Sequence, residues 1–346
     1  MRFTKFSFIL LLAGLCLIVA LLLTACGKSG GDKGKPGETV SSNDNSESLF
    51  TIRYRPKWHP QAQFAGVYMA SKKGFYTNYG LNVITQSVTP DEYALTQLES
   101  GNSDIVLIDL ITALKATADS TWLVNLAQVS QKTSIMLVAK KSRGFNSINS
   151  FNGKKLGLWQ SGSSLISEVF LHQNNLTMQI IPVNWSVSLF LQDVVDVINA
   201  MRYNEYHQLI QAGLDESDLF SITLSESLGT IPEEGFYTSR AFYEKYPRQC
   251  RAFAEATMDG WLYAFSNQVE TVDTVIEVMN QAKIRANRPH QEWMLNQMKE
   301  VVMGDPANIG KLTRAGFDNT VALIKDNFGH QTKIKYEDLV PYANQK

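Results

Sequence analysis

The sequence predicts an α/β fold with two sheets of parallel strands. From residue 49 onward, short apolar segments of strand length alternate with helical segments, and this alternation is typical of strand-helix-strand units. The strands are too many for one small sheet, and a chain of 346 residues has room for about two domains. Hydrophobic residues make up 44% of the chain, which excludes disorder for most of it.

The charge balance excludes one class of function. The chain has 32 Lys and Arg against 33 Asp and Glu, which gives a formal net charge of −1. Proteins that bind nucleic acid carry a marked local excess of basic residues. We therefore expect no nucleic-acid partner.

The N-terminal segment has the pattern of an export signal. Basic residues precede an apolar run over residues 6–23, as in signal peptides. A permanent membrane helix is the alternative, because about 18 apolar residues just span a bilayer. The run ends in a Leu-Thr-Ala-Cys tetrapeptide that resembles the bacterial lipoprotein signal. This resemblance implies removal of residues 1–25 and acylation of Cys26, which would anchor the chain to the outer side of the cell membrane.

The next segment, residues 26–48, is predicted to be a flexible tether. It is rich in Gly, Ser, Lys, Asp and Glu and has one aliphatic side chain, Val40, so it cannot bury enough apolar surface to fold. Of the three cysteines, Cys16 leaves with the signal and Cys26 is lipidated. Cys250 is then the only thiol of the folded part, and we expect neither a disulfide nor a Cys/His metal site there.

The folded part begins with two predicted strands and a capped helix. Residues 49–55 and 81–88 are predicted strands, because they are short runs rich in apolar and β-branched residues. Thr-Pro-Asp-Glu at residues 89–92 has the pattern of a capping box, with Thr at the N-cap and Pro at the first helical position. A helix should begin there and end before Gly101.

The remainder of the chain continues the alternation. Further strands are predicted at residues 104–110, 122–129, 135–139, 155–159, 180–183 and 194–201. A helix is predicted over residues 165–173. The longest helical pattern, residues 247–267, starts with Pro and carries its apolar residues on one face. That face should be core, with Cys250 buried and inert.

Signatures of catalysis are missing from the sequence. No GxGxxG, HExxH or GxSxG motif and no phosphate-binding GxxxxGK motif occurs. The five histidines, at positions 59, 172, 207, 290 and 330, share no spacing typical of metal ligands. We therefore predict no enzyme activity, no cofactor and no metal.

Aromatic and polar residues follow several of the predicted strands. They are Trp58 and Gln61, Asp109, Trp159 and Ser161, and the run Tyr203, Asn204 and Glu205. Because α/β sheets bind ligands at the carboxyl ends of their strands, these residues are candidate ligand contacts. Aromatic faces with a few amides and carboxylates suit a planar organic ligand.

Several motifs resemble one known family. They are Trp58-x-Pro60-Gln61-x-Gln63-Phe64-Ala65-Gly66-Val67-Tyr68, Lys73-Gly74-Phe75-Tyr76, Leu98-x-x-Gly101-x-x-Asp104, Leu156-Gly157-Leu158-Trp159, Tyr203-Asn204-Glu205 and Glu234-Gly235-Phe236-Tyr237. The sequence resembles the solute-binding proteins of ABC importers, in the branch with thiamine pyrimidine-precursor synthase-like and alkanesulfonate-binding-like members. The resemblance covers most of the folded part.

This resemblance implies a two-lobed periplasmic-binding-protein type II fold, in which two α/β domains are joined by two crossovers and the ligand lies in the cleft. Residues 49–140 and 235–346 are expected to form lobe 1, and residues 141–234 lobe 2. The crossovers are expected near 139–142 and 228–234. The implied partners are a small-molecule ligand and the permease and ATPase of the importer, and the implied state is a lipid-anchored, extracytoplasmic monomer.

The chain departs from the family pattern at two positions. Thiamine-precursor-binding members have Trp-x-Pro-Asn-x-x-His, whereas this chain has Gln61 in place of the Asn and Phe64 in place of the His. It also lacks the Cys-rich motif of the eukaryotic synthases, which consume their own histidine. Phe64 therefore argues against that self-consuming chemistry.

Each candidate residue also has a structural alternative. Trp58 stacks on the ligand or closes the base of lobe 1, Gln61 contacts the ligand or forms a turn, and Phe64 lines the pocket or faces the core. Asp109 pairs with the ligand or caps the next helix. Trp159 and Ser161 resemble a stacking group and a donor at a helix start.

Alternatives also remain for the acidic candidates of the second half of the chain. Glu205, in the run that begins at Tyr203 and Asn204, recognises an amino-pyrimidine edge or bridges the closing lobes. Glu234, at the second crossover, binds ligand or stabilises the hinge.

The predicted function is capture of a small heteroaromatic nutrient, such as a thiamine pyrimidine precursor, by closure of the cleft. The alternatives are a receptor for alkanesulfonates, nitrate-like anions or riboflavin, an enzyme that forms the pyrimidine precursor, and a sensory module that acts on a membrane kinase.

Overall fold

The computed structural model describes residues 48–88, 93–118, 120–159, 164–184, 186–329 and 332–341. The predicted signal peptide, Cys26, the capping box at 89–92 and nearly all of the predicted tether lie outside these ranges. Residues from Glu47 to Lys346 belong to one unit. Within the described ranges, no helix has both the length and the apolar character needed to cross a membrane.

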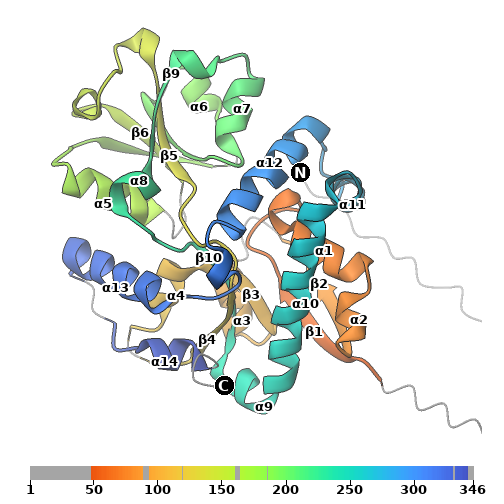
Figure 1. Cartoon of the computed structure of the whole chain (residues 1–346). Coiled ribbons are helices and arrows are strands. Elements are labelled where there is room, and N and C mark those ends of the chain that lie inside the picture. The colour runs from red at the N-terminus through yellow and green to blue at the C-terminus, as the bar shows by residue number, and fades with distance from the viewer. Residues whose placement is uncertain are drawn as a thin grey trace, which may run out of the picture. The chain divides into compact units, whose positions relative to one another are not determined.

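Two five-stranded sheets, called A and B here, organise this unit (Figure 1). Sheet A has the order β2-β1-β3-β10-β4, with β1 (Phe50–Arg55), β2 (Leu81–Thr85), β3 (Ile105–Asp109), β4 (Leu123–Gln128) and β10 (Glu234–Ser239). Sheet B has the order β7-β6-β8-β5-β9, with β5 (Ile135–Lys140), β6 (Lys155–Trp159), β7 (Gln179–Val183), β8 (Val197–Met201) and β9 (Leu219–Thr223). The predicted α/β fold with two sheets is confirmed.

The expectation of wholly parallel sheets is wrong. β1 is parallel to β2 and β3, and β6 is parallel to β7 and β8. However, β10 is antiparallel to β3 and β4, and β5 is antiparallel to β8 and β9. Each of these two strands is the first one after the chain has crossed between the sheets. It starts at the edge where the neighbouring parallel strand ends, so it must run in the opposite direction.

The two crossovers lie at residues 129–134 and 229–233. The second lies within the expected range 228–234. The first comes earlier than the expected 139–142, because β5 already pairs within sheet B. The expected boundary at residue 140 falls at the end of β5. Because β5 belongs to sheet B, the change of sheet comes before this strand.

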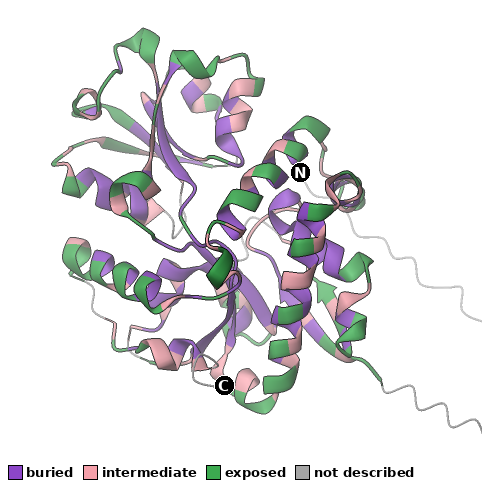
Figure 2. Cartoon of the chain, in the orientation of Figure 1, coloured by how far each residue is buried: buried purple, intermediate pink, exposed green. Residues whose placement is uncertain are grey.

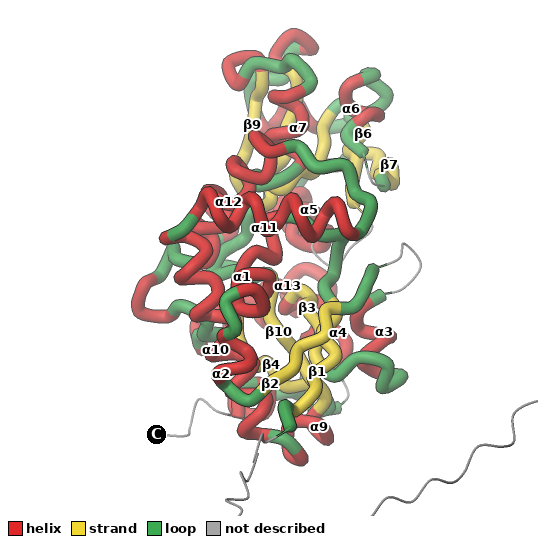
Figure 3. The backbone as a smooth tube through the Cα atoms, turned by 90° about the vertical axis from the view of Figure 1, so that its right-hand side faces the viewer, coloured by secondary structure: helices red, strands yellow, loops and turns green. Residues whose placement is uncertain are grey.

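Helices flank both sheets, as Figure 3 shows from the side. Beside sheet A lie α1 (Ala65–Lys72), α2 (Phe75–Asn78), α3 (Ala94–Glu99), α4 (Leu110–Ala116), α9 (Arg240–Lys245), α10 (Pro247–Ser266), α11 (Gln268–Gln281), α12 (Arg288–Val302), α13 (Arg314–Phe328) and α14 (Tyr336–Leu339). Beside sheet B lie α5 (Ser164–Gln173), α6 (Ser188–Leu191), α7 (Glu205–Gln211) and α8 (Leu224–Leu228).

The core has a layer on each face of each sheet, because alternate side chains of a strand point to opposite faces. In β3, Ile105 and Leu107 join one hydrophobic cluster, and Val106 and Ile108 join the next. In β5, Leu137 belongs to the same cluster as Val106. This shared cluster contains residues of both sheets and of the helices beside them. Figure 2 shows that the central strands are largely buried.

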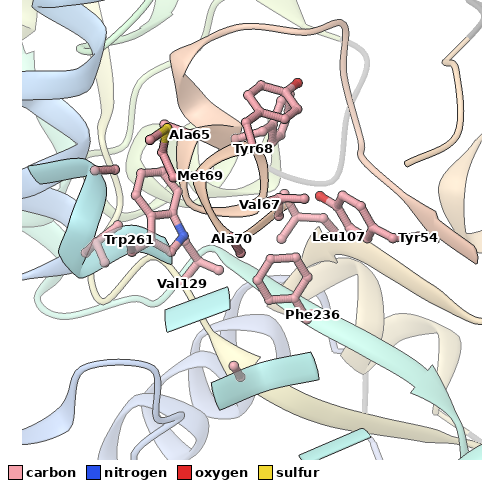
Figure 4. Packing of buried hydrophobic residues seen from close by; sticks show 14 of the residues in the cluster. Tyr54, Ala65, Val67, Tyr68, Met69, Ala70, Leu107, Val129, Phe236 and Trp261 are labelled. Atoms are coloured by element: carbon pink, nitrogen blue, oxygen red, sulfur yellow. The ribbon is translucent and has the colours of Figure 1, made fainter. Parts of the chain in front are cut away.

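Close packing of α1 against α10 fixes the position of α1. A Cβ atom on Gly260 would overlap the carbonyl oxygen of Gly66, and one on Gly66 would overlap the Trp261 indole. Only glycine therefore fits at either position. Figure 4 shows the buried Trp261 ring beside the helix that carries Ala65 and Met69. This contact holds the segment just before α1, which reaches into the candidate site.

Candidate ligand-binding site

The candidate site lies where the carboxyl ends of the two sets of parallel strands approach each other. Trp58 follows β1 of sheet A, and Trp159 ends β6 of sheet B. Their ring centroids are 6.2 Å apart and the ring planes are nearly perpendicular, at 86°. Both indoles are partly exposed, and the Trp159 Nε1 atom donates to the Asn199 carbonyl oxygen at 2.9 Å. Both crossovers run between these two ends of the sheets. They therefore hold Trp58 and Trp159 close together.

A lysine and two carboxylates form the charged part of the site. The Lys57 Nζ atom lies 2.6 Å from Asp109 Oδ1 and 3.1 Å from Glu234 Oε1. Asp109 is the last residue of β3 and is paired directly with Glu234, the first residue of β10. Both carboxylates are buried, and the Lys57 side chain is 18% exposed. Burial alone would lower the pKa of Lys57, but attraction to the two carboxylates outweighs it and raises the pKa.

Asp109 was predicted either to cap a helix or to pair with a ligand, and the structure gives it another partner. It occupies the N-cap position of α4, but its side chain makes no capping hydrogen bond. The Lys57 ammonium takes its carboxylate instead.

Two glutamines extend this charged group towards sheet B. The Gln61 Nε2 atom donates to Gln63 Oε1 at 2.5 Å. The Gln63 Nε2 atom donates to Glu234 Oε1 at 2.5 Å and to the Tyr203 hydroxyl at 3.0 Å. Because Tyr203 follows β8, this chain of hydrogen bonds joins the two sheets. Burial, together with the nearby carboxylates, raises the pKa of Tyr203.

Glu205 begins α7 and is held by backbone and amide donors. Its carboxylate accepts from the Met201 backbone N–H at 2.8 Å and from Asn204 Nδ2 at 2.9 Å. Burial raises the pKa of Glu205 to about 7, because these donors offset only part of the desolvation. Glu205 is therefore partly protonated near neutral pH.

A pair of hydrogen-bonded histidines joins α7 to α12 beside Glu205. The Nδ1 atoms of His207 and His290 are 2.9 Å apart, and the rings are almost parallel. The His290 Nε2 atom contacts Asn204 Oδ1 at 3.0 Å. On its other side, His207 stacks on Trp293 with a centroid distance of 4.7 Å. In Figures 1 and 3, α12 lies next to α7, between the levels of the two sheets.

Glu233 ties the two crossovers together. Its carboxylate accepts from the Thr133 hydroxyl at 3.0 Å and from the Ser134 backbone N–H at 3.0 Å. Burial, with repulsion from Asp109, raises the pKa of Glu233 to about 7. This hydrogen-bonded link lies where the chain passes between the sheets, so it fixes the two crossover segments to each other.

Comparison with known families identifies the chain. A family model described as NMT1/THI5 like matches residues 61–271. The chain belongs to the NMT1/THI5-like family. The matched range runs from Gln61 in the glutamine pair to the first turn of α11, so it contains most of the site.

Individual relatives of this NMT1/THI5-like protein are described as binding proteins rather than enzymes. It is 20% identical over 278 residues to the riboflavin-binding protein RibY of Chloroflexus aurantiacus, covering 78% of each chain. It is 25% identical over 234 residues to the putative binding protein YtlA of Bacillus subtilis, covering 64% of this chain and 66% of YtlA.

A solved structure agrees with the fold. The periplasmic aliphatic sulphonate binding protein SsuA of Escherichia coli superposes with a TM-score of 0.63 at 15% identity, covering 85% of this chain and 92% of SsuA. The NMT1/THI5-like chain therefore has the fold of periplasmic binding proteins.

The structure of this NMT1/THI5-like protein brings most predicted site residues to one place. Those at the junction of the sheets are Trp58, Gln61, Asp109, Trp159, Tyr203, Asn204, Glu205 and Glu234. Phe64 instead packs in the core cluster and is 1% exposed, so we leave it out of the site. Ser161 lies outside the described residues.

Four further residues of the site were not predicted: Lys57, Gln63, Glu233 and His290. Lys57 and Glu233 are sequence neighbours of the predicted Trp58 and Glu234, and Gln63 lies inside the family motif, so the sequence held a signal for them. His290 carried none, because its partner Asn204 is 86 positions away in the chain.

Proposed function

We propose that this chain is the extracytoplasmic solute-binding protein of an ABC-type importer and that it captures a small heteroaromatic nutrient, with a thiamine pyrimidine precursor as the first candidate. The aromatic pair of Trp58 and Trp159, one from each sheet, carries this proposal. Each indole face can stack on a flat ligand for roughly 0.5–1.5 kcal/mol. The amide, hydroxyl and carboxylate of Gln63, Tyr203 and Glu234 lie within the same hydrogen-bond network and would orient the ring.

In this proposal, sheets A and B with their helices act as two lobes. Opening would separate Trp58 from Trp159 and Gln63 from Tyr203, and ligand would favour closure by contacting both edges at once. The crossovers at 129–134 and 229–233 are the proposed hinges. Transport energy would come from the ATPase of the importer. This chain would act as a monomer and dock on the permease.

A thermal-shift screen of the purified protein tests the ligand assignment. We expect a 4-aminopyrimidine or thiamine to raise the melting temperature, since a ligand at 100 times its dissociation constant adds about 2.7 kcal/mol. Trp159→Ala should abolish the shift because it removes a stacking face. Tyr79→Ala is the matched control, because Tyr79 is an exposed aromatic at the opposite, amino-terminal end of β2. A shift that survives in Trp159→Ala would contradict the proposed site.

Riboflavin and sulfonates are the second candidates, because RibY is described as a riboflavin-binding protein and SsuA as a sulphonate-binding protein. A riboflavin or taurine response that depends on Trp159 would keep the receptor function and replace the pyrimidine. The screen therefore includes both compounds.

We also propose that a lipid on Cys26 holds the protein at the membrane. Two or three acyl chains bind a bilayer firmly, because each buried CH₂ contributes about 0.8 kcal/mol. Cys26→Ser should move the protein from the membrane fraction to the soluble extracytoplasmic fraction, and Cys250→Ser should not. Retention of the Cys26→Ser protein at the membrane would refute the lipid anchor.

A further inference from the structure

The site holds more negative than positive groups. Asp109, Glu233, Glu234 and Glu205 are all buried, and each interacts electrostatically with Tyr203 at the centre of the site. The charge of Lys57 acts on all four of them. A buried region with this composition is short of positive charge.

Most of these carboxylates have their acceptor oxygens occupied. Lys57 holds Asp109, Thr133 and Ser134 hold Glu233, and Asn204 and the Met201 backbone hold Glu205. These interactions occupy both oxygens of Glu233 and Glu205, and they place the Lys57 ammonium against Asp109 Oδ1.

Glu234 is different from the other three. Its Oε1 atom accepts from Gln63 and contacts Lys57, whereas its Oε2 atom has no hydrogen-bond partner, although the residue is only 2% exposed. A buried carboxylate oxygen without a donor loses its hydrogen bonds to water and gains none in return, which is costly. It is therefore an acceptor that a bound donor would satisfy.

The ammonium of Lys57 cannot serve as a site for an anion. It already lies within 3.1 Å of two carboxylate oxygens, so its single positive charge is outweighed by Asp109 and Glu234 and attracts no further anion. A sulfonate or nitrate would also come close to Glu234 and Asp109 and be repelled. The buried charge thus opposes anions even though a lysine is present.

We propose that this site selects planar ligands that carry a positive charge or adjacent N–H donors and that it rejects anions. Glu234 is the residue that determines this specificity. The inference rests on the proposed function. An amidine or aminopyrimidine edge presents two N–H donors in one plane, which matches a carboxylate. The aromatic pair of Trp58 and Trp159 would hold the ring, and Glu234 would read its edge. The ligand class is therefore a cationic or amidine-like heteroaromatic compound.

A pair of probes that differ in charge tests this selection. Benzamidine and benzoate are planar rings of similar size, cationic and anionic respectively at neutral pH. We expect calorimetric titration of the wild-type protein to give at least tenfold tighter binding for benzamidine than for benzoate. In Glu234→Gln, benzamidine should bind at least tenfold more weakly, because the neutral amide lacks the charge and also presents N–H groups to the ligand.

The matched control is Glu277→Gln, because Glu277 is an exposed carboxylate on α11 paired with Lys72. It should leave both affinities unchanged. Asp109→Asn is the second variant if Glu234→Gln does not fold, and it too should weaken benzamidine relative to benzoate. Equal or tighter binding of benzoate, no binding of either probe, or an unchanged affinity ratio in both variants would overturn the inference.

These outcomes are separable from failure of the proposed function. A sulfonate or riboflavin that binds in a Trp159-dependent way would leave the receptor function intact and remove only the selection by charge. Binding of every screened compound independently of Trp159 would remove the proposed site itself.

Discussion

Replacing Lys57 with Met should lower the free energy of unfolding by roughly 3–5 kcal/mol near pH 8, because a buried ion pair that loses one partner leaves the other charge uncompensated. Here two carboxylates lose their counter-charge together, since Asp109 is 7% and Glu234 2% exposed. Methionine preserves most of the aliphatic length of the side chain, so packing changes little. Urea unfolding followed by circular dichroism measures the effect.

The loss should depend on pH and on the second carboxylate. Without the ammonium, which lowers it, the pKa of Glu234 rises further, so the destabilisation should shrink as the pH falls and that carboxyl becomes neutral. Lys57→Met combined with Asp109→Asn should recover part of the lost stability for the same reason. Lys72→Met is the control, since Lys72 forms an exposed pair with Glu277 and such pairs contribute little. A Lys57→Met protein as stable as the control would show that the pair is not buried in solution.

The fold could be predicted from the sequence where local pattern and environment agree. The segment 135–139 is an unbroken apolar run, and it forms β5, a central strand with both faces covered. The helix predicted at 247–267 is α10, because its single apolar face packs against the first core cluster. β10 was missed because its sequence starts with Glu234 and Gly235, neither of which favours a strand. Its place between β3 and β4 comes from long-range pairing, which a local pattern does not contain.

The site was predictable only in part, for a similar reason. Residues at strand ends, such as Trp58, Asp109 and Trp159, could be named because strand ends are where α/β sheets place ligands. Their partners could not, because a charged or amide side chain gives no signal of what it will contact. Lys57 could have been named as a neighbour of Trp58, but only the folded chain brings it to Asp109, 52 positions away.

The buried carboxylates and histidines of the junction should act on stability in opposite directions with pH. Burial raises the pKa values of Glu205 and Glu233 to about 7, so their neutral forms are favoured in the folded protein. Their contribution is fully present below their ordinary pKa values and is lost as the pH rises through about 7. Burial, together with the charge of His207, lowers the pKa of His290 to about 4, so its contribution is lost as the pH falls.

Acidification should therefore weaken the contact between α7 and α12 through His290. The neutral His290 ring donates from Nε2 to Asn204 and accepts at Nδ1 from His207. A second proton on His290 would place two N–H groups against each other at 2.9 Å, so the contact requires neutral His290. The other charged groups near His290 have partners of their own. Arg288 pairs with Asp273 and Glu292, and Glu205 accepts a hydrogen bond from Asn204.

The expected size follows from the difference between the ordinary pKa of histidine and the lowered pKa of His290. Each unit corresponds to about 1.4 kcal/mol, so the folded protein should lose about 3 kcal/mol between about pH 7 and pH 4 through this residue. His290→Gln retains an amide donor but does not titrate. The difference in free energy of unfolding between the wild type and His290→Gln, measured by urea unfolding, should therefore decrease as the pH falls from 7 to 4. Glu205 and Glu233 titrate in both proteins, so their contributions cancel in this difference. His172→Gln, at an exposed position of α5, serves as the control. A difference that stays constant with pH would mean that the histidine pair does not hold the two helices together.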